Sequence, residues 1–188
     1  MEDNPYGLLT IDGQDPLPAM RSLDDTHVVY LGGSFSKTFA PGLRVGWVLA
    51  PHGVREKLVL AQESATLAPS VFSQFVVSTY LAHWDWRAQL DTFRAMYRER
   101  RDAMLRGLTE HMPPGSTWTH PTGGFFVWLT LPRASTPRRC SPPRRLGARG
   151  VHPPGTAFYA DGMGSRNIRL SYCFPPPRAD HRRHPAPR

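Results

Sequence analysis

The sequence predicts an α/β fold, and three observations carry that prediction. A run of β-branched and aromatic residues, Val28 to Leu31, is typical of a buried strand. Apolar residues recur every three or four positions from Pro51 to Ala65 and again from about Trp84 to His111, which indicates amphipathic helices. A later run, Phe125 to Leu131, is rich in aromatic and β-branched residues and predicts a further strand.

The first part of the chain predicts strands joined by loops. Met1 to Leu9 is typical of the end of a strand followed by a loop, with a turn at Asn4-Pro5. Residues 10 to 25 are polar and contain glycine and proline, so a loop with a short helical turn is expected. We expect the strand at Val28 to end at Gly32-Gly33, and a second strand to cover Val45 to Ala50.

Three helical segments are expected in the middle of the chain. The first should end before Pro69, a second should cover Ser70 to Ala82, and the long one should stop at Met112. The apolar stripe of the first is Val54, Leu58, Ala61 and Ala65, and that of the long helix is Leu90, Phe93, Tyr97, Met104 and Leu108. The aromatic residues expected in the core are Trp84, Trp86, Phe125 and Trp128.

The composition changes after Pro132. Residues 133 to 152 are crowded with arginine and proline and show neither periodicity, so no structure is assigned to them. Order is expected again at Pro154 to Tyr159. From Ile168 to Phe174 the residues alternate, with the apolar side chains on one face and Arg169 on the other.

The net charge of +8 arises entirely from the C-terminal part of the 188-residue chain. Residues 1 to 132 contain 11 basic and 13 acidic residues, whereas residues 133 to 188 contain 12 and 2. No apolar run approaches the ~18 residues that suggest a membrane span. The N-terminus lacks a signal-peptide pattern, and Cys140 and Cys173 lack metal-site spacing, so a cytoplasmic protein is expected. His181 and His184 are interpreted as solvated, and no metal site is predicted.

The loop after Val28 has the composition of an anion-binding site. Two glycines precede the hydroxyls of Ser34 and Ser36, and two cations, Lys37 and Arg44, follow. Such a loop can approach a phosphate closely, and an arginine can bind it with two donors. Lys37 is one of only two lysines among 23 basic residues. Because an amine, unlike a guanidinium, can lose its proton and attack a carbonyl, lysine here indicates covalent chemistry.

Five blocks in order resemble the class I/II, fold-type I family of pyridoxal-phosphate-dependent aminotransferases. Within this family the chain most resembles the branch of aromatic and 2-aminoadipate aminotransferases. The blocks are DNPYG from Asp3, GSFSKTFAPGLRVGW from Gly33, TGGFFVWL from Thr122, PGTAFYADG from Pro154 and RLSYCF from Arg169. The resemblance implies the C-terminal part of that fold: a remnant of the large mixed-sheet domain and an α+β small domain.

The resemblance also implies a role for each matched residue. Lys37 would form the internal aldimine with pyridoxal 5'-phosphate and then shuttle the proton, while Asp3 would hold the pyridine nitrogen protonated. Tyr6 would contact the phenolic oxygen, and Arg169 would bind the substrate carboxylate. The residues that would hold the phosphate are Ser34, Ser36 and Arg44. The implied partners are an amino acid, a 2-oxo acid and a second copy of the chain in a homodimer.

Two features depart from the family pattern. The family's first half is not matched, so the chain is expected to be a fragment, with residues 1–75 from the large domain and 76–177 forming the small domain. Residues 178–188 are expected to be a disordered basic tail. In 133–152 the family would have an amphipathic helix, and we interpret the Arg/Pro-rich text as a shift of reading frame that ends near Pro153, with another after Pro177.

Three alternatives to an aminotransferase are considered. Another fold-type I enzyme, a lyase or decarboxylase, would share the lysine, the aspartate and the phosphate ligands. A regulator with a non-catalytic aminotransferase-like domain would bind the cofactor only as a signal. A nucleic-acid binder would use the basic tail, but that tail has no interleaved aromatic residues, so this alternative is disfavoured.

Overall fold

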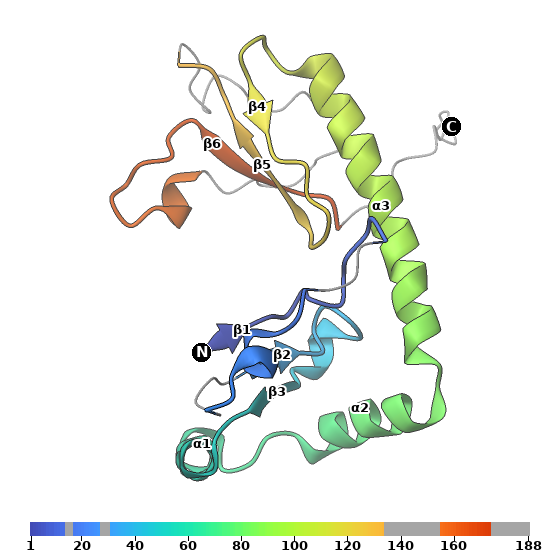
Figure 1. Ribbon diagram of the computed structural model, residues 1–188, viewed down its shortest axis with the longest axis vertical. Coiled ribbons are helices and arrows are strands. Elements are labelled where there is room, and N and C mark those ends of the chain that lie inside the picture. Colours follow the sequence, from blue (N-terminus) through green and yellow to red (C-terminus); the bar gives the residue numbers. More distant parts are fainter. Residues whose placement is uncertain (14–16, 27–30, 134–154, 174–188) are drawn as a thin grey trace, which may run out of the picture. The chain divides into compact units, whose positions relative to one another are not determined.

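A computed structural model describes residues 1–13, 17–26, 31–133 and 155–173. The chain divides into two compact units, Met1–Arg94 and Ala95–Arg188 (Figure 1). The division falls within a helix, and the boundary expected at residues 75 and 76 stays a prediction. The Arg/Pro-rich segment, apart from Arg133, and the tail from residue 178 lie outside the described residues.

The first unit contains a three-stranded sheet in the order β1-β2-β3. Strand β1 (Glu2–Asp3) is parallel to β2 (Leu31–Ser34), which is antiparallel to β3 (Gly46–Leu49). The turn after β1 and the strand at β3 confirm the sequence predictions. The 3-10 helices η1 (Met20–Leu23) and η2 (Pro41–Leu43) lie in the connecting loops, and η1 confirms the short helical turn expected before residue 25.

The prediction that Gly32 and Gly33 end the strand is wrong, because β2 continues through both glycines to Ser34. The reason lies on the neighbouring strand. Gly33 is paired with Trp47, and a Cβ atom on Gly33 would lie 2.5 Å from Cε2 of that indole. Glycine is therefore required here by the close approach of a side chain, not by a turn. The predicted residues 28–30 of this strand lie outside the described part of the chain.

Helices α1 (His52–Thr66) and α2 (Val71–His83) confirm the predicted helical segments. The Ser70 side chain caps α2 by accepting a hydrogen bond from the Ser73 N–H at 3.2 Å. The expected burial is not observed for α1, which has no buried residue, and Leu58 on its apolar stripe is 43% exposed. In α2, Val77 is the residue that is buried.

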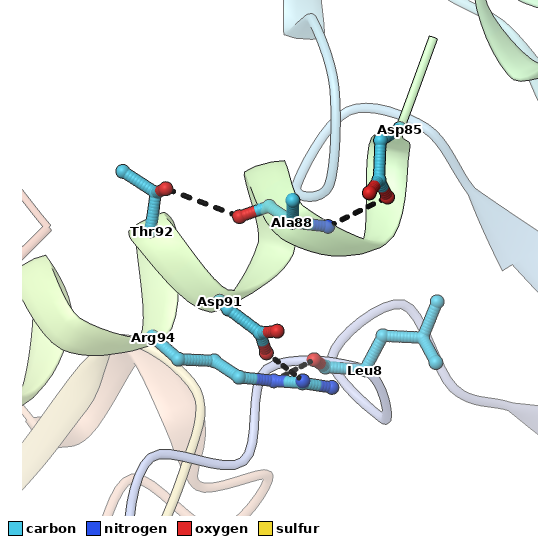
Figure 2. Close-up of polar contacts among 6 residues, drawn as sticks. All are labelled: Leu8, Asp85, Ala88, Asp91, Thr92 and Arg94. Carbon is cyan, nitrogen blue, oxygen red and sulfur yellow. Dashed lines mark hydrogen bonds and ion pairs between the residues drawn. The ribbon is translucent and has the colours of Figure 1, made fainter.

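The long helix α3 (Trp86–His111) confirms the predicted apolar stripe, since Leu90 and Leu108 are buried. Asp85 accepts a hydrogen bond from the Ala88 N–H at the start of the helix (Figure 2). Trp84, expected in the core, is 60% exposed instead and stacks on Tyr80, so that expectation is wrong. The indole lies just outside the helix, where the apolar period of α3 does not apply.

The second unit contains the antiparallel sheet β4-β5-β6, formed by β4 (Thr117–Trp118), β5 (Phe126–Thr130) and β6 (Asn167–Ser171). Strands β5 and β6 confirm the prediction, and both alternate between half-buried and buried residues. The two-residue β4 was not predicted. Side chains on one face are buried and form the core of the unit: Phe125, Val127, Leu129, Leu131, Ile168, Leu170 and Tyr172.

Contacts between α3 and the residues around β5 organise the second unit. The rings of Tyr97 and Phe125 lie 4.8 Å apart, and the largely buried Arg101 donates from Nη1 to the Pro121 carbonyl. The Tyr172 hydroxyl donates to the carbonyl of Gly124 at 2.8 Å, and Gly123 O lies 3.1 Å from the same hydroxyl. No helix in the described ranges is both long and apolar enough to cross a bilayer.

Candidate functional site

Parallel strands β1 and β2 bring two chemically important segments to the same edge of the sheet. Asp3 pairs with Gly32, and the Asn4 N–H donates to the Gly32 carbonyl at 3.2 Å. Because β1 and β2 run in the same direction, the residues after Asp3 and after Ser34 leave the sheet at the same end. In open α/β sheets, the carboxyl ends of the strands are where ligands bind.

The lysine loop after β2 has a compact backbone. The N–H groups of Phe39 and Ala40 both donate to the Phe35 carbonyl, and the Phe35 N–H donates to the Val45 carbonyl at 3.1 Å. Lys37 lies inside this turn and is half-buried. A lysine amine in such a turn can act as a nucleophile toward a carbonyl.

An aromatic contact attaches the lysine loop to α2. The rings of Phe39 and Tyr80 are stacked, with centroids 4.1 Å apart and planes inclined by 14°. Aromatic pairs contribute about 0.5–1.5 kcal/mol beyond area burial. Neither residue was singled out in the sequence, because the two partners are far apart in it. The stack fixes the loop two residues after Lys37.

The predicted phosphate ligands form one connected group. The Ser34 Oγ accepts a hydrogen bond from the Ser36 N–H at 3.1 Å, and Arg44 Nη1 donates to the Ser36 Oγ at 3.4 Å. The same guanidinium nitrogen lies 3.4 Å from the Pro41 carbonyl. Arg44 is exposed, so its other donors face solvent and remain available to an anion. The group thus brings hydroxyl and guanidinium donors together in the segment 34–44.

Arg44 has an unusual backbone conformation. Its φ of 56° and ψ of 36° place it in the left-handed region, at the end of η2. A non-glycine residue there costs about 1–2 kcal/mol. Strained residues concentrate at functional sites, and here the strain accompanies the guanidinium that contacts Ser36.

Tyr6 lies in a tight turn that follows Asp3 and β1. The Leu9 N–H donates to the Tyr6 carbonyl at 2.8 Å, and Tyr6 is half-buried. The turn is closed by Asn4, whose side chain lies so near Gly7 that a Cβ there would be 2.6 Å from Nδ2. Arg94 of α3 secures the same turn through a bond from Nε to the Leu8 carbonyl, as Figure 2 shows. Asp91 holds that guanidinium through a 2.7 Å ion pair.

Arg169 belongs to the second unit, whereas the other predicted site residues belong to the first. It lies on the half-buried face of β6, and its guanidinium contacts the rings of Phe126 and Phe158. Its Cζ atom is 4.2 Å from the first centroid and 4.3 Å from the second. Sequence reasoning missed both phenylalanines, although Phe126 lies in one of the matched blocks and Phe158 in another.

The family model "Aminotransferase class I and II" matches residues 3–177. An aromatic-amino-acid aminotransferase of Thermococcus litoralis is 39% identical over 178 residues, covering 94% of this chain and 42% of the relative. A 2-aminoadipate transaminase of Thermus thermophilus is 35% identical over 177 residues, covering 92% of this chain and 44% of the relative. The chain thus spans less than half the length of these curated relatives.

A solved structure agrees with these relatives. The kynurenine aminotransferase of Pyrococcus horikoshii, crystallised with PMP, superimposes with a TM-score of 0.82 at 36% identity, covering 92% of this chain and 42% of that one. An uncharacterized helix-turn-helix transcriptional regulator of Bacillus subtilis is also 32% identical over 174 residues, covering 93% of this chain and 35% of the regulator. Both a family of enzymes and regulators related to it therefore share this region.

Proposed function

Because the chain belongs to the class I and II aminotransferase family, we propose that it carries part of the site of an enzyme transferring an amino group between an amino acid and a 2-oxo acid. The observation that supports this most directly is the pairing of Asp3 with Gly32, which brings the aspartate to the sheet edge where the Lys37 loop begins. The family's fold is fold-type I, and the superposition covers 92% of this chain.

The residues at this edge fit pyridoxal 5'-phosphate. The connected donors of Ser34, Ser36 and Arg44 suit a phosphate, and the half-buried Lys37 amine suits an aldehyde. Asp3 supplies a carboxylate for a protonated ring nitrogen. When bound, this cofactor supplies an electron sink that stabilises negative charge on the substrate α-carbon. With the cofactor bound, Lys37 would move the proton at that carbon, and Tyr6 would donate to the phenolic oxygen.

Arg169 is proposed to bind the substrate carboxylate. Its guanidinium makes no hydrogen bond or ion pair within the described ranges and is half-buried, so a carboxylate gains from the reduced hydration of its partner. We assign residues 1–75 to the cofactor-binding domain and 76–177 to the small domain.

The test uses the second lysine of the chain as a matched control. The purified chain is mixed with pyridoxal phosphate, reduced with borohydride and digested, and the peptide that has gained mass is identified. We expect the label on Lys37 in the unaltered chain and in Lys57→Ala, and its loss in Lys37→Ala. Labelling of exposed Lys57 in preference to Lys37, or equal labelling in Lys37→Ala, would contradict the proposed role.

A second candidate is a regulator domain, which the similarity to the Bacillus subtilis protein favours. A lyase or decarboxylase of the same fold type is the third. Adding an amino acid to the cofactor-loaded chain separates the three: a transferase releases the 2-oxo acid and leaves the aminated cofactor, and a lyase or decarboxylase releases other products. A regulator keeps the cofactor unchanged. We also propose that the protein is cytoplasmic and forms a homodimer. Sedimentation of the purified chain tests the dimer.

A further inference from the structure

The half-buried face of the β4-β5-β6 sheet carries an aromatic cluster around one cation. In the β5-β6 register Trp128 stands directly opposite Arg169, and Phe126 is its diagonal neighbour on the same face. Diagonal neighbours in an antiparallel pair are within reach of aromatic and long side chains. The Arg169 guanidinium lies over the Phe126 ring, 4.2 Å from its centroid.

The second ring comes from η4 (Gly155–Phe158), which is pressed against β6. A Cβ atom on Gly155 would lie 2.4 Å from Asn167 Cβ and 2.5 Å from the Gly164 carbonyl, so only glycine permits this approach. Phe158, at the end of η4, also meets Trp128 edge-on at 5.5 Å. The position of its ring is therefore set by packing on two sides.

The Arg169 guanidinium therefore contacts two aromatic rings from separate elements. The Phe158 ring makes the second contact, with its centroid 4.3 Å from Arg169 Cζ. The Nε atom is buried and has no hydrogen-bond partner within the described ranges. Because Nε is buried, the two Nη nitrogens are the donors left for a ligand.

We propose that Phe126 and Phe158 are positioning residues that clamp the Arg169 guanidinium between their rings, so that it presents its two Nη nitrogens end-on to the carboxylate of the substrate. The inference rests on the proposed function, because it specifies how Arg169 performs the role proposed there. Two ring faces replace water on the cation and restrict its rotation. A bidentate ion pair with a carboxylate depends on the orientation of the guanidinium. A clamp that holds the guanidinium in that orientation therefore favours carboxylate binding.

The first test reads the clamp directly, without cofactor or turnover. In the nitrogen–proton NMR spectrum of the full chain, ring currents should shift the Nε–H signal of Arg169 upfield. We expect that displacement to shrink in Phe126→Leu and in Phe158→Leu, and to persist in Phe126→Tyr and Phe158→Tyr, which keep the ring. Tyr159→Leu is the matched control, since that ring of the same segment contacts Trp128 at 6.2 Å. An unchanged Arg169 signal in both leucine variants, with backbone signals still dispersed, overturns the clamp.

The second test reads its consequence for a carboxylate. Pyruvate is titrated into each chain, and the Arg169 signal is followed. Each leucine variant should bind pyruvate roughly tenfold more weakly than the unaltered chain, as loss of a desolvated cation–π contact predicts. Each tyrosine variant and Tyr159→Leu should stay within about twofold. Equal affinity in the leucine variants overturns the positioning role.

The two proposals fail separately. If Arg169→Met binds pyruvate as well as the unaltered chain, or if the unaltered chain gives no saturable change, the carboxylate role of Arg169 is wrong and the end-on presentation with it. If Arg169→Met abolishes binding while the leucine variants do not weaken it, the carboxylate role stands and the clamp alone is wrong. Labelling of Lys37 is unaffected by either result.

Discussion

The two units differ in the predicted site residues they carry and in how far their apolar side chains are buried. The second unit buries most of one face of its sheet, with Val127, Leu129 and Ile168 each at most 5% exposed. The first unit carries the lysine loop and its hydroxyls, yet no residue of β3 or α1 is buried, and Trp47, Leu60 and Phe72 are 46%, 56% and 74% exposed. The segment that carries most of the predicted site residues is therefore the one whose apolar side chains are less covered.

The difference follows from how each sheet obtains its neighbours. Strands β5 and β6 pair with each other over five residues and pack on α3 through Phe125 and Tyr97. In the first unit β1 pairs over two residues, and β3 is an edge strand within the described residues. Burial of apolar area is the main stabilising term, so the second unit should be the more stable.

The strongest test of this comparison applies one substitution to each unit. Leu129→Ala removes a side chain that is 1% exposed and should lower the free energy of unfolding by about 2–5 kcal/mol. Leu60→Ala, on the 56% exposed α1 position, should change it by less than about 0.5 kcal/mol. Urea unfolding of both variants measures the difference. Equal losses would show that α1 is covered in solution and that the two units do not differ in burial as described.

A smaller effect is expected from the Tyr172 hydroxyl inside the second unit. Tyr172→Phe removes the hydroxyl bonded to the carbonyls of Gly123 and Gly124 and should cost about 1 kcal/mol, the usual net value of a buried hydrogen bond. Tyr159→Phe is the control, because that tyrosine is 38% exposed. Thermal or urea denaturation compares the two. A loss as large in Tyr159→Phe would show that the Tyr172 hydrogen bonds are not the cause.

The smallest expected effect concerns pH. Burial, and secondarily the Cys173 thiolate, raise the pKa of Tyr97 above its ordinary value of 10.0, while Arg100 opposes this. As pH rises above 10 the unfolded chain loses the phenol proton before the folded chain does, so stability should fall in that range. Tyr97→Phe should reduce this alkaline loss and Cys173→Ala should reduce it partly. An unchanged alkaline slope in Tyr97→Phe, measured by unfolding from pH 8 to 11, would contradict the assignment.

The sequence predicted the elements that depend on local pattern. The alternation from Ile168 and the stripe of α3 are periodic, and both were confirmed. The end of β2 was mistaken because glycine is a local stop signal, whereas the indole of Trp47 that requires Gly33 comes from another strand. Strand β4 was missed because two residues carry no period. The exposure of α1 could not be anticipated, since amphipathicity shows which face can be buried and not what covers it.

The candidate site shows the same limit. The hydroxyls and cations of the lysine loop were recognisable as a set because they are contiguous, and the structure connects Ser34, Ser36 and Arg44. The ring contacts beside predicted site residues, Phe39 on Tyr80 in the first unit and Phe158 on Arg169 in the second, join residues from separate elements. Side chains of this kind are read as core in a sequence, because their geometry toward a distant partner has no local signature.

The contact of Trp47 with Gly33 places a fluorescent indole beside the lysine loop. The indole lies against the strand residue immediately before Ser34, at the base of the lysine loop. Indole emission falls in the near ultraviolet, where pyridoxal-type chromophores absorb, and energy transfer between two such dipoles rises steeply as they approach. Binding of a pyridoxal-type chromophore at this loop should therefore lower the fluorescence of Trp47, and its release should restore that fluorescence.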